Sequence, residues 1–346
     1  MTNNEIWFIL TKISNEKKVK LLEKYNSEEV IRKNKNIIKE LRNEELEEIN
    51  EEKINKFKEY MNNNNINYIT IKSKDYPEKL KHLLEPPYVL FYKGNLDLLK
   101  GRLVAVIGAR KCTSYGAGIT KIISKVISEN NITVVSGLAT GIDSIAQKNS
   151  FNNVGRTIGI LGCGIDVVYP KHNKLLYEDI LKNDGLIISE FLPQTPPMAY
   201  NFPRRNRIIS GISDKLIIIE ANVKSGSLIT VNYALFLGMD IMAVPGPVLS
   251  GNSEGCNKLI RDGAKPFTEI EDLYDFLNIV KYDNEKKENN VYKSMILSTI
   301  NSEPIHLDNI IDIVKVDRKV LFELLFEMQK RNEIICLPGN YYAKSI

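Results

Sequence analysis

Four short segments of the sequence combine glycine, hydroxyl and basic residues in the way that phosphate-binding loops do. Each follows a short apolar run and precedes a stretch with helical spacing. A helix N-terminus offers free N–H groups and the positive end of the helix dipole to a phosphate. The candidate contacts in these segments are Gly108, Arg110, Ser136, Gly137, Lys171, Asn173, Lys224, Ser225, Gly226 and Ser227. Together they favour a ligand that carries several phosphate groups.

A cluster of three arginines within four positions lies in the segment Phe202–Ser210, FPRRNRIIS, where a helix is expected to start. Arginines repel one another, and the helix dipole disfavours cations at this end of a helix. The cluster therefore needs an anion or an acidic partner. The candidate phosphate contacts are Arg205, Asn206 and Arg207. The alternative is a local ion pair, and we expect at least one arginine to be structural, paired with Glu220 or Asp214.

The first of these loops lacks the GxGxxG pattern of dinucleotide-binding proteins. Arg110 stands where a second glycine would let a pyrophosphate approach the backbone, and no acidic residue follows Ser136-Gly137 to bind a ribose hydroxyl. Both departures argue against a nicotinamide cofactor. Arg110 is expected either to bind phosphate or to form a local cap or ion pair. Asp143 is expected to serve the start of a helix, and His172 to be an exposed loop residue.

Six apolar runs alternate with helical segments from residue 103 onward. The runs are 103–108, 133–137, 157–162, 186–190, 215–220 and 241–246. Runs that are apolar throughout are typical of strands buried on both faces, and their alternation with helices predicts a parallel sheet. Open parallel sheets bind ligands at the carboxyl ends of their strands, so the candidate loops are expected to share one edge.

The chain divides into four segments by composition and periodicity. Residues 1–65 are polar with helical spacing and predict a small helical domain, and residues 66–280 hold the sheet. Residues 281–291 are charged and predict a linker. Residues 292–346 predict three helices and a β-hairpin, the order found in a winged helix.

Composition excludes several classes of protein. The 346 residues are 43% hydrophobic and 26% charged with a net charge of +4, so wholesale disorder is excluded and gross charge does not predict polyanion binding. Three histidines and four separated cysteines favour neither a metal site nor a disulfide framework. No apolar run reaches the roughly 18 residues of a membrane span, and we expect a cytoplasmic protein.

The pattern favours a binding protein over an enzyme. No nucleophile–base pair and no pair of catalytic carboxylates stands out, and no cofactor is expected. A track of phosphate-binding loops suits a single nucleic-acid strand, which also needs aromatic faces for its bases. The candidate aromatic residues are Tyr115, Tyr169, Tyr200 and Phe202.

A series of ordered motifs resembles the DNA-processing protein A family (DprA, also called Smf). These motifs are IGARKCTSYG, SGLATGIDSIAQ, LGCGIDVVYPKHN, ISEF, FPRRNRIISG, KSGSLIT, AVPG and GCNKLIRDGA, and they cover residues 76–275. The resemblance implies an α/β fold with an extended Rossmann-like parallel sheet, a sterile-alpha-motif-like (SAM-like) N-terminal domain and a C-terminal winged-helix domain. It also implies a homodimer without catalytic activity. Such a protein binds and protects incoming single-stranded DNA and loads the recombinase RecA during natural transformation.

The resemblance assigns roles to individual residues. The DNA contacts of the family fall on Arg110, Lys171 and the Arg205-Asn206-Arg207 triplet. Leu259 and Ile260 fall near its dimer surface. The sequence departs from the family at two positions. Ala109 replaces the usual serine or threonine, and Gln147 replaces the usual histidine.

Two alternative functions are weaker. A phosphoribohydrolase-like, nucleotide-cleaving enzyme on a similar sheet needs a PGGxGT loop followed by a glutamate. The comparable loops VPGPV and KSGSLIT lack a glutamate in register. The C-terminal domain could read duplex DNA, but its ten basic and ten acidic residues after position 280 cancel, which favours a protein–protein role or dimer support.

Overall fold

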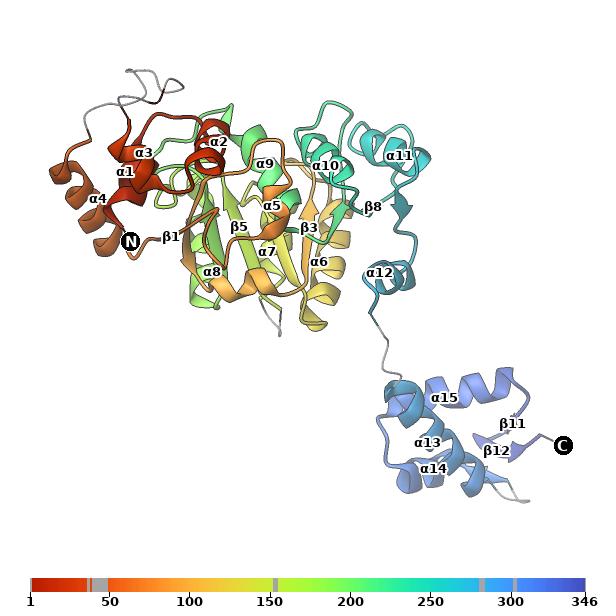
Figure 1. Cartoon of the computed structure of the whole chain (residues 1–346). Coiled ribbons are helices and arrows are strands. Elements are labelled where there is room, and N and C mark those ends of the chain that lie inside the picture. The colour runs from red at the N-terminus through yellow and green to blue at the C-terminus, as the bar shows by residue number, and fades with distance from the viewer. Residues whose placement is uncertain are drawn as a thin grey trace. The chain divides into compact units, whose positions relative to one another are not determined.

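The chain folds into two compact units, Met1–Ile279 and Val280–Ile346 (Figure 1). The computed structural model describes residues 2–35, 38, 49–151, 155–279, 284–300 and 304–345, with side chains 284–290 left aside. The segment predicted to be a winged-helix domain, residues 292–346, lies entirely within the second unit. The boundary predicted between the helical N-terminal domain and the sheet does not appear as a division between compact units.

A single sheet organises the first unit. Within the described residues it holds nine strands in the order β1-β2-β6-β5-β4-β3-β7-β8-β9. The strands are β1 (Asn67–Thr70), β2 (Val89–Gly94), β3 (Leu103–Ile107), β4 (Thr133–Ser136), β5 (Thr157–Leu161), β6 (Leu186–Ser189), β7 (Lys215–Ile218), β8 (Ile241–Ala243) and β9 (Lys265–Pro266). The six predicted apolar runs are strands β3 to β8 and all pair in parallel, so the predicted α/β fold is confirmed.

Three further strands extend this parallel core at its edges. Strand β2 pairs antiparallel with both β1 and β6, and β9 adds a short parallel pairing beyond β8. Strand β9 was not predicted, because two residues carry no period that a sequence reading could detect.

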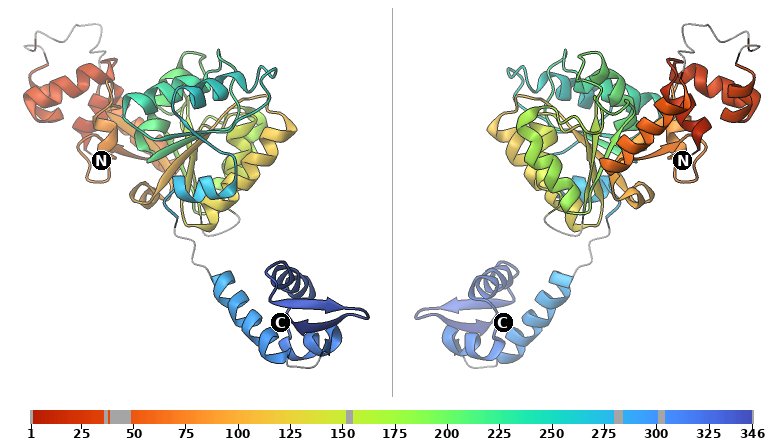
Figure 2. Two further views of the ribbon diagram at one scale, coloured as in Figure 1. Left: turned by 90° about the vertical axis from the view of Figure 1, so that its right-hand side faces the viewer. Right: turned by 90° about the vertical axis from the view of Figure 1, so that its left-hand side faces the viewer.

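Helices cover both faces of the sheet, as the side views of Figure 2 show. One face packs against α6 (Ser114–Glu129), α7 (Ile142–Lys148) and α12 (Ile270–Phe276). The other packs against α5 (Glu78–Lys81), α9 (Asn201–Ile212), α10 (Ser227–Phe236) and α11 (Glu254–Arg261). Burial on both faces explains why the strands are apolar throughout.

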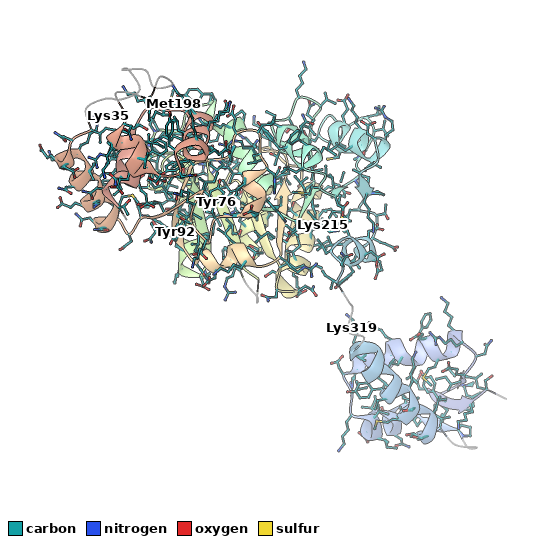
Figure 3. All side chains as sticks on the ribbon, in the orientation of Figure 1. Lys35, Tyr76, Tyr92, Met198, Lys215 and Lys319 are labelled. Carbon is teal, nitrogen blue, oxygen red and sulfur yellow. The ribbon has the colours of Figure 1, made fainter. Side chains whose placement is uncertain are left out.

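The strand order reverses at β3, and this reversal positions the candidate loops. Strand β4 lies on one side of β3 and β7 on the other. Connections that leave in opposite directions open a crevice at the carboxyl ends of such strands. In Figure 3, Met198, which follows β6, lies at the upper edge of this unit, while Lys215, the first residue of β7, lies lower. The upper edge therefore carries the loops that follow the parallel strands.

The N-terminal helices pack onto the sheet instead of forming a separate core. They are α1 (Asn3–Leu10), α2 (Asn15–Tyr25), α3 (Glu28–Lys33) and α4 (Glu51–Asn63). Their buried residues, such as Trp7 and Phe8, share one hydrophobic cluster with Tyr88 and Phe91 of the sheet and with α8 (Lys174–Lys182). The helices are thus where the sequence predicts them, but their core continues into the sheet.

The second unit contains the predicted order of three helices and a hairpin. Helices α13 (Asn284–Thr299), α14 (Leu307–Val314) and α15 (Arg318–Lys330) precede strands β11 (Ile334–Leu337) and β12 (Tyr341–Lys344). A short strand β10 (Ile305–His306), which was not predicted, pairs with β12. We predicted a linker over residues 281–291, and this prediction is wrong for residues 284–291, which are helical. Residues 281–283 lie outside the described residues. The charged residues of this segment lack an apolar period, so this part of the helix was not predictable from the sequence.

A buried lysine joins α1 to α2. Lys18 is 5% exposed, and its Nζ donates hydrogen bonds to the carbonyl oxygens of Ile9 (3.0 Å) and Thr11 (3.1 Å). It also lies over the rings of Phe8 and Tyr88. Burial lowers the pKa of Lys18 from 10.5 to about 7.

We predict that Lys18 makes the first unit more stable as the pH rises. Between about pH 7 and 10.5 the unfolded chain binds a proton at Lys18 that the folded chain has lost, so raising the pH favours folding. The contribution is about 1 kcal/mol per pH unit in this window. Urea unfolding at pH 7.5 and 9.5, followed through the single tryptophan, Trp7, measures it. The Lys18→Met variant should lose this increase, and an identical increase in both proteins would contradict the prediction.

Candidate nucleic-acid interface

A hollow of about 670 Å³ lies at the carboxyl ends of β3 and β7, beside the strand-order reversal. We call it the strand-end groove. Its walls come from the β3–α6 loop, the loop that contains Tyr169, the loop that contains Pro197, helix α9 and the loop before α10. The lining residues that the sequence predicted are Gly108, Arg110, Arg205, Asn206, Lys224, Ser225, Gly226 and Ser227, together with the aromatic candidates Tyr169 and Phe202.

The β3–α6 loop presents two exposed cations to the groove. Arg110 and Lys111 follow Gly108 and Ala109, and within the described residues neither has an ion-pair partner. The Arg110 guanidinium carbon lies 5.6 Å from the centroid of the Phe202 ring. The alternative that Arg110 forms a local ion pair is therefore wrong. Lys111 was missed, although its place beside Arg110 was a signal for it.

A buried carboxylate fixes the shape of this loop. Glu220 accepts hydrogen bonds from the Thr113 backbone N (2.9 Å) and from Thr113 Oγ1 (2.5 Å). Gly116 permits this approach, because a Cβ there would lie 2.5 Å from the Glu220 carboxyl carbon. Glu220 is therefore not the partner of an arginine, contrary to the alternative drawn from the sequence. Asp214 is not that partner either, since it pairs with Lys79.

Arg205 is structural and not an exposed phosphate contact. It is 4% exposed and donates hydrogen bonds to the carbonyl oxygens of Gly137 (2.7 Å) and Ile160, at the ends of β4 and β5. Burial lowers the pKa of Arg205 to about 10, and burial raises that of the neighbouring Asp143. Asp143 accepts a hydrogen bond from the Gly137 backbone N at 3.0 Å. Arg205 thus forms the floor of the groove with its guanidinium bonded inside the protein, and its contact with DNA stays a prediction.

Arg207 is also buried, and it lies away from the groove lining. Its Nη2 pairs with Glu190 Oε2 at 2.5 Å, and both side chains are almost fully covered. Arg204 Nη2 lies 3.3 Å from the same oxygen. Successive residues of a helix point about 100° apart, so a sequence cluster does not remain a cluster in space. The acidic partner expected for the arginines is therefore Glu190, which the sequence reading did not select.

Asn206 is the member of the triplet that faces the groove. It is half-buried, and its Nδ2 donates to the carbonyl oxygen of Gly226 at 3.2 Å. This bond joins α9 to the loop before α10. In that loop Lys224 is exposed and has no ion-pair partner within the described residues, while the Ser225 and Ser227 hydroxyls lie 2.6 Å apart. The N-terminus of α10 opens beside them.

Ser136, Gly137 and Asn173 are buried and serve the scaffold. Ser136 Oγ donates to the Val106 carbonyl oxygen at 2.7 Å, and Asn173 Nδ2 donates to the Leu138 carbonyl oxygen at 2.8 Å. Ser136 is the last residue of β4, so its side chain still points into the sheet layer. Their polar groups are used inside the protein, and the prediction that these residues contact DNA stays a prediction.

Lys171 is not among the residues that line the groove. It is exposed at the start of a short 3₁₀ helix (Lys171–Asn173), and it directly follows Tyr169 and Pro170, which line a smaller hollow of about 80 Å³ together with Arg110. The rings of Tyr169 and Phe202 have centroids 5.4 Å apart. The groove therefore combines an aromatic pair with the cations Arg110, Lys111 and Lys224, while Lys171 follows the aromatic wall in the sequence.

The electrostatic balance of the groove is positive. Among its described lining residues the one carboxylate is Asp143, which lies against Arg205 at the floor. Exposed Arg110, Lys111 and Lys224 are free to meet an anion. The lining also includes Asn222, two residues before Lys224, and Asn252, next to Gly251, neither of which was predicted.

The predicted dimer residues lie on another part of the unit. Leu259 lines a hollow of about 790 Å³ formed by α10, α11 and the strands β8 and β9, together with Leu228 and Leu235. Ile260 is half-buried and packs against the core of the sheet. Their role in a dimer stays a prediction.

The described residues contain neither a cluster of metal ligands nor a membrane-spanning helix. No group of three or more histidine, cysteine, aspartate or glutamate side chains is placed to hold a metal ion. Over the same residues, every helix is too short or too polar to span a bilayer.

The fold and the groove define an α/β protein of the Rossmann-like class with a cationic hollow at its strand-order reversal. The model of the family described as DNA recombination-mediator protein A matches residues 67–278, more than half of the chain. The chain belongs to this family.

Individual relatives agree with this assignment. The chain is 48% identical over 200 residues to DNA processing protein DprA of Streptococcus pneumoniae, covering 57% of this chain and 70% of that protein. It is 32% identical over 288 residues to protein Smf of Escherichia coli, covering 80% and 77%.

Two solved structures are similar to this chain in fold. The X-ray structure of DNA processing protein A from S. pneumoniae has a TM-score of 0.65 at 36% identity, covering 80% of this chain and 98% of that one. A Helicobacter pylori DNA processing protein A, described for its single-stranded DNA binding mode, has a TM-score of 0.56 at 30% identity, covering 62% and 96%.

We predict that Arg205 and Arg110 differ in what they stabilise. Arg205→Ala should lower the free energy of unfolding by roughly 2–4 kcal/mol, because two carbonyl groups and Asp143 lose their buried partner. Arg110→Ala should change it by less than about 0.5 kcal/mol, because its side chain is exposed. Urea unfolding followed through Trp7 compares them. An equal loss of unfolding free energy in the two variants would contradict the assignment of Arg205 to the buried floor and Arg110 to the exposed wall of the groove.

Proposed function

We propose that this protein is a single-stranded DNA-binding recombination mediator. The observation that carries the proposal is the strand-end groove, whose lining holds the Tyr169–Phe202 pair together with exposed Arg110, Lys111 and Lys224, cations without an ion-pair partner among the described residues. Cations on opposite walls suit a ligand with phosphates at regular intervals. Aromatic faces suit unpaired bases, since every base has a π-face. Membership of the DNA recombination-mediator protein A family and the likeness to the H. pylori DNA-binding structure support this function.

The DNA strand would lie across the carboxyl ends of the parallel β-strands. Its phosphates would meet Arg110 and Lys111 on one wall and Lys224 with the α10 N-terminus on the other, and Lys171 would extend the track beyond the groove lining. Protection of incoming DNA follows from covering the strand in this way. Loading of RecA in natural transformation is the cellular role that we propose from the family.

We propose no catalytic role for the groove. A phosphoribohydrolase-like reaction needs a carboxylate free to act on the sugar, and the one carboxylate among the described lining residues, Asp143, is held beneath the groove by Gly137 and Arg205. Incubation with nucleoside monophosphates tests this: release of free base would restore the enzymatic alternative.

The binding prediction concerns salt dependence. Affinity for an oligothymidine, measured by fluorescence titration, should fall with salt at a log–log slope of about 0.7 per neutralised phosphate. Arg110→Ala and Lys224→Ala should each weaken binding about fivefold and reduce the slope, because each removes a charge-assisted contact. Lys121→Ala, an exposed lysine on α6 outside the groove lining, is the matched control. Unchanged affinity in both groove variants would exclude this binding site.

We also propose a homodimer through the α10–α11 hollow. Leu235 is 55% exposed there, and it lines the hollow beside Leu228 and Leu259. Leu235→Glu should convert the dimer to a monomer in size-exclusion chromatography with light scattering, because a charge would be buried in an apolar contact. A dimer that persists in this variant would place the interface elsewhere.

A further inference from the structure

The loop between β8 and α11 carries two apolar side chains that the fold leaves in solvent. Val248 is 86% exposed and Leu249 is 100% exposed. The segment from Pro245 to Ser253 contains no charged residue. Scattered exposed apolar residues are common. Two adjacent aliphatic side chains at a loop tip, however, leave more apolar surface in water, at a greater cost in free energy, than a polar pair would.

This tip is held at both ends. Tyr115 donates its hydroxyl to the Pro245 carbonyl oxygen at 2.9 Å, and the Asn257 amide bonds both the N (3.2 Å) and the O (2.9 Å) of Gly246. A turn closes between the Ser250 N and the Pro247 carbonyl oxygen at 2.9 Å. The second and third residues of that turn are Val248 and Leu249. The loop therefore presents its apolar pair from a fixed base.

The same loop also forms part of the strand-end groove. Asn252 lines the groove, and its Nδ2 donates to the Lys111 carbonyl oxygen at 3.3 Å, while its own carbonyl oxygen accepts from the Ala221 N at 2.8 Å. Leu249 is three residues from Asn252, so a chain of this length reaches at most about 10 Å. The apolar tip thus stands beside the wall that carries Arg110 and Lys111.

The chemistry of the tip selects one component of a nucleic acid. Without a charge or a donor side chain at Val248 or Leu249, the tip has nothing to offer a phosphate. The faces and methyl groups of unpaired bases are the apolar part of a single strand, and in a duplex these faces are covered by stacking. In other nucleic-acid complexes, apolar side chains contact thymine methyl groups and the base faces that unstacking exposes.

We propose that the Val248–Leu249 tip contacts the nucleobases of the strand as it leaves the groove. This inference rests on the proposed function, and it adds a second kind of contact to it. The groove holds the phosphates by charge, and the tip adds base contact that is independent of salt and tolerant of sequence. The tip also favours a single strand over a duplex, because only unpaired bases expose their faces.

A double comparison of protein and ligand tests the proposal. Val248→Ser/Leu249→Ser and the wild-type chain are titrated with an oligothymidine and with an oligomer of the same length that lacks bases at the positions beyond the groove. The double variant should bind the oligothymidine about five- to tenfold more weakly, and the two proteins should bind the partly abasic oligomer equally. Leu84→Ser, which removes another exposed leucine (75% exposed) outside the groove lining, is the matched control and should match the wild type.

Each other outcome is decisive. An equal loss on both oligomers, or no loss on either, overturns the base contact while leaving groove binding intact. Conversion of the double variant to a monomer in light scattering overturns it in favour of contact with a second copy of the chain. If the wild-type chain binds neither oligomer, the proposed function fails and this inference fails with it. Trp7 fluorescence confirms that the variants are folded.

Discussion

The groove depends on one buried guanidinium. Arg205 reaches from α9 beneath the groove and binds the carbonyl oxygens at the ends of β4 and β5, with Asp143 close by. A charge so far from water persists only where hydrogen bonds and an opposite charge compensate its lost hydration. That requirement fixes the distance between two strand ends and the helix that spans them. The exposed cations on the walls are arranged around this floor.

The protein divides its cations by their surroundings. Arg205 and Arg207 are buried and paired or hydrogen-bonded within the protein, and they set the geometry. Arg110, Lys111 and Lys224 are exposed without ion-pair partners among the described residues, and they remain available to a ligand. Glu220 and Glu190 support this division, since one holds the β3–α6 loop through Thr113 and the other neutralises α9. A small net charge of +4 is thus compatible with a strongly cationic groove.

The sequence predicted the parts of the fold that repeat. Six apolar runs between helices were sufficient for the parallel sheet, and the sheet placed Arg110 and Lys224 at one edge. The repeating pattern did not predict which way a side chain points at the end of a strand or at the start of a helix. Ser136 ends a strand and points inward, and on α9 Arg205 separates from Arg204 and Arg207, which share Glu190. Asn252 and Glu190 depend on contacts between distant loops, which no local pattern encodes. The N-terminal helices were predicted, but their shared core with Tyr88 and Phe91 required the tertiary structure.

The most direct measurement is a crystal structure of the full chain with a short oligothymidine. The account predicts a strand across the carboxyl ends of β3 and β7, with phosphate oxygens at hydrogen-bonding distance from Arg110 and Lys224 and with Arg205 still bonded to Gly137 beneath it. A strand bound on another surface, with the side chains of Arg110 and Lys224 free of it, would contradict the account.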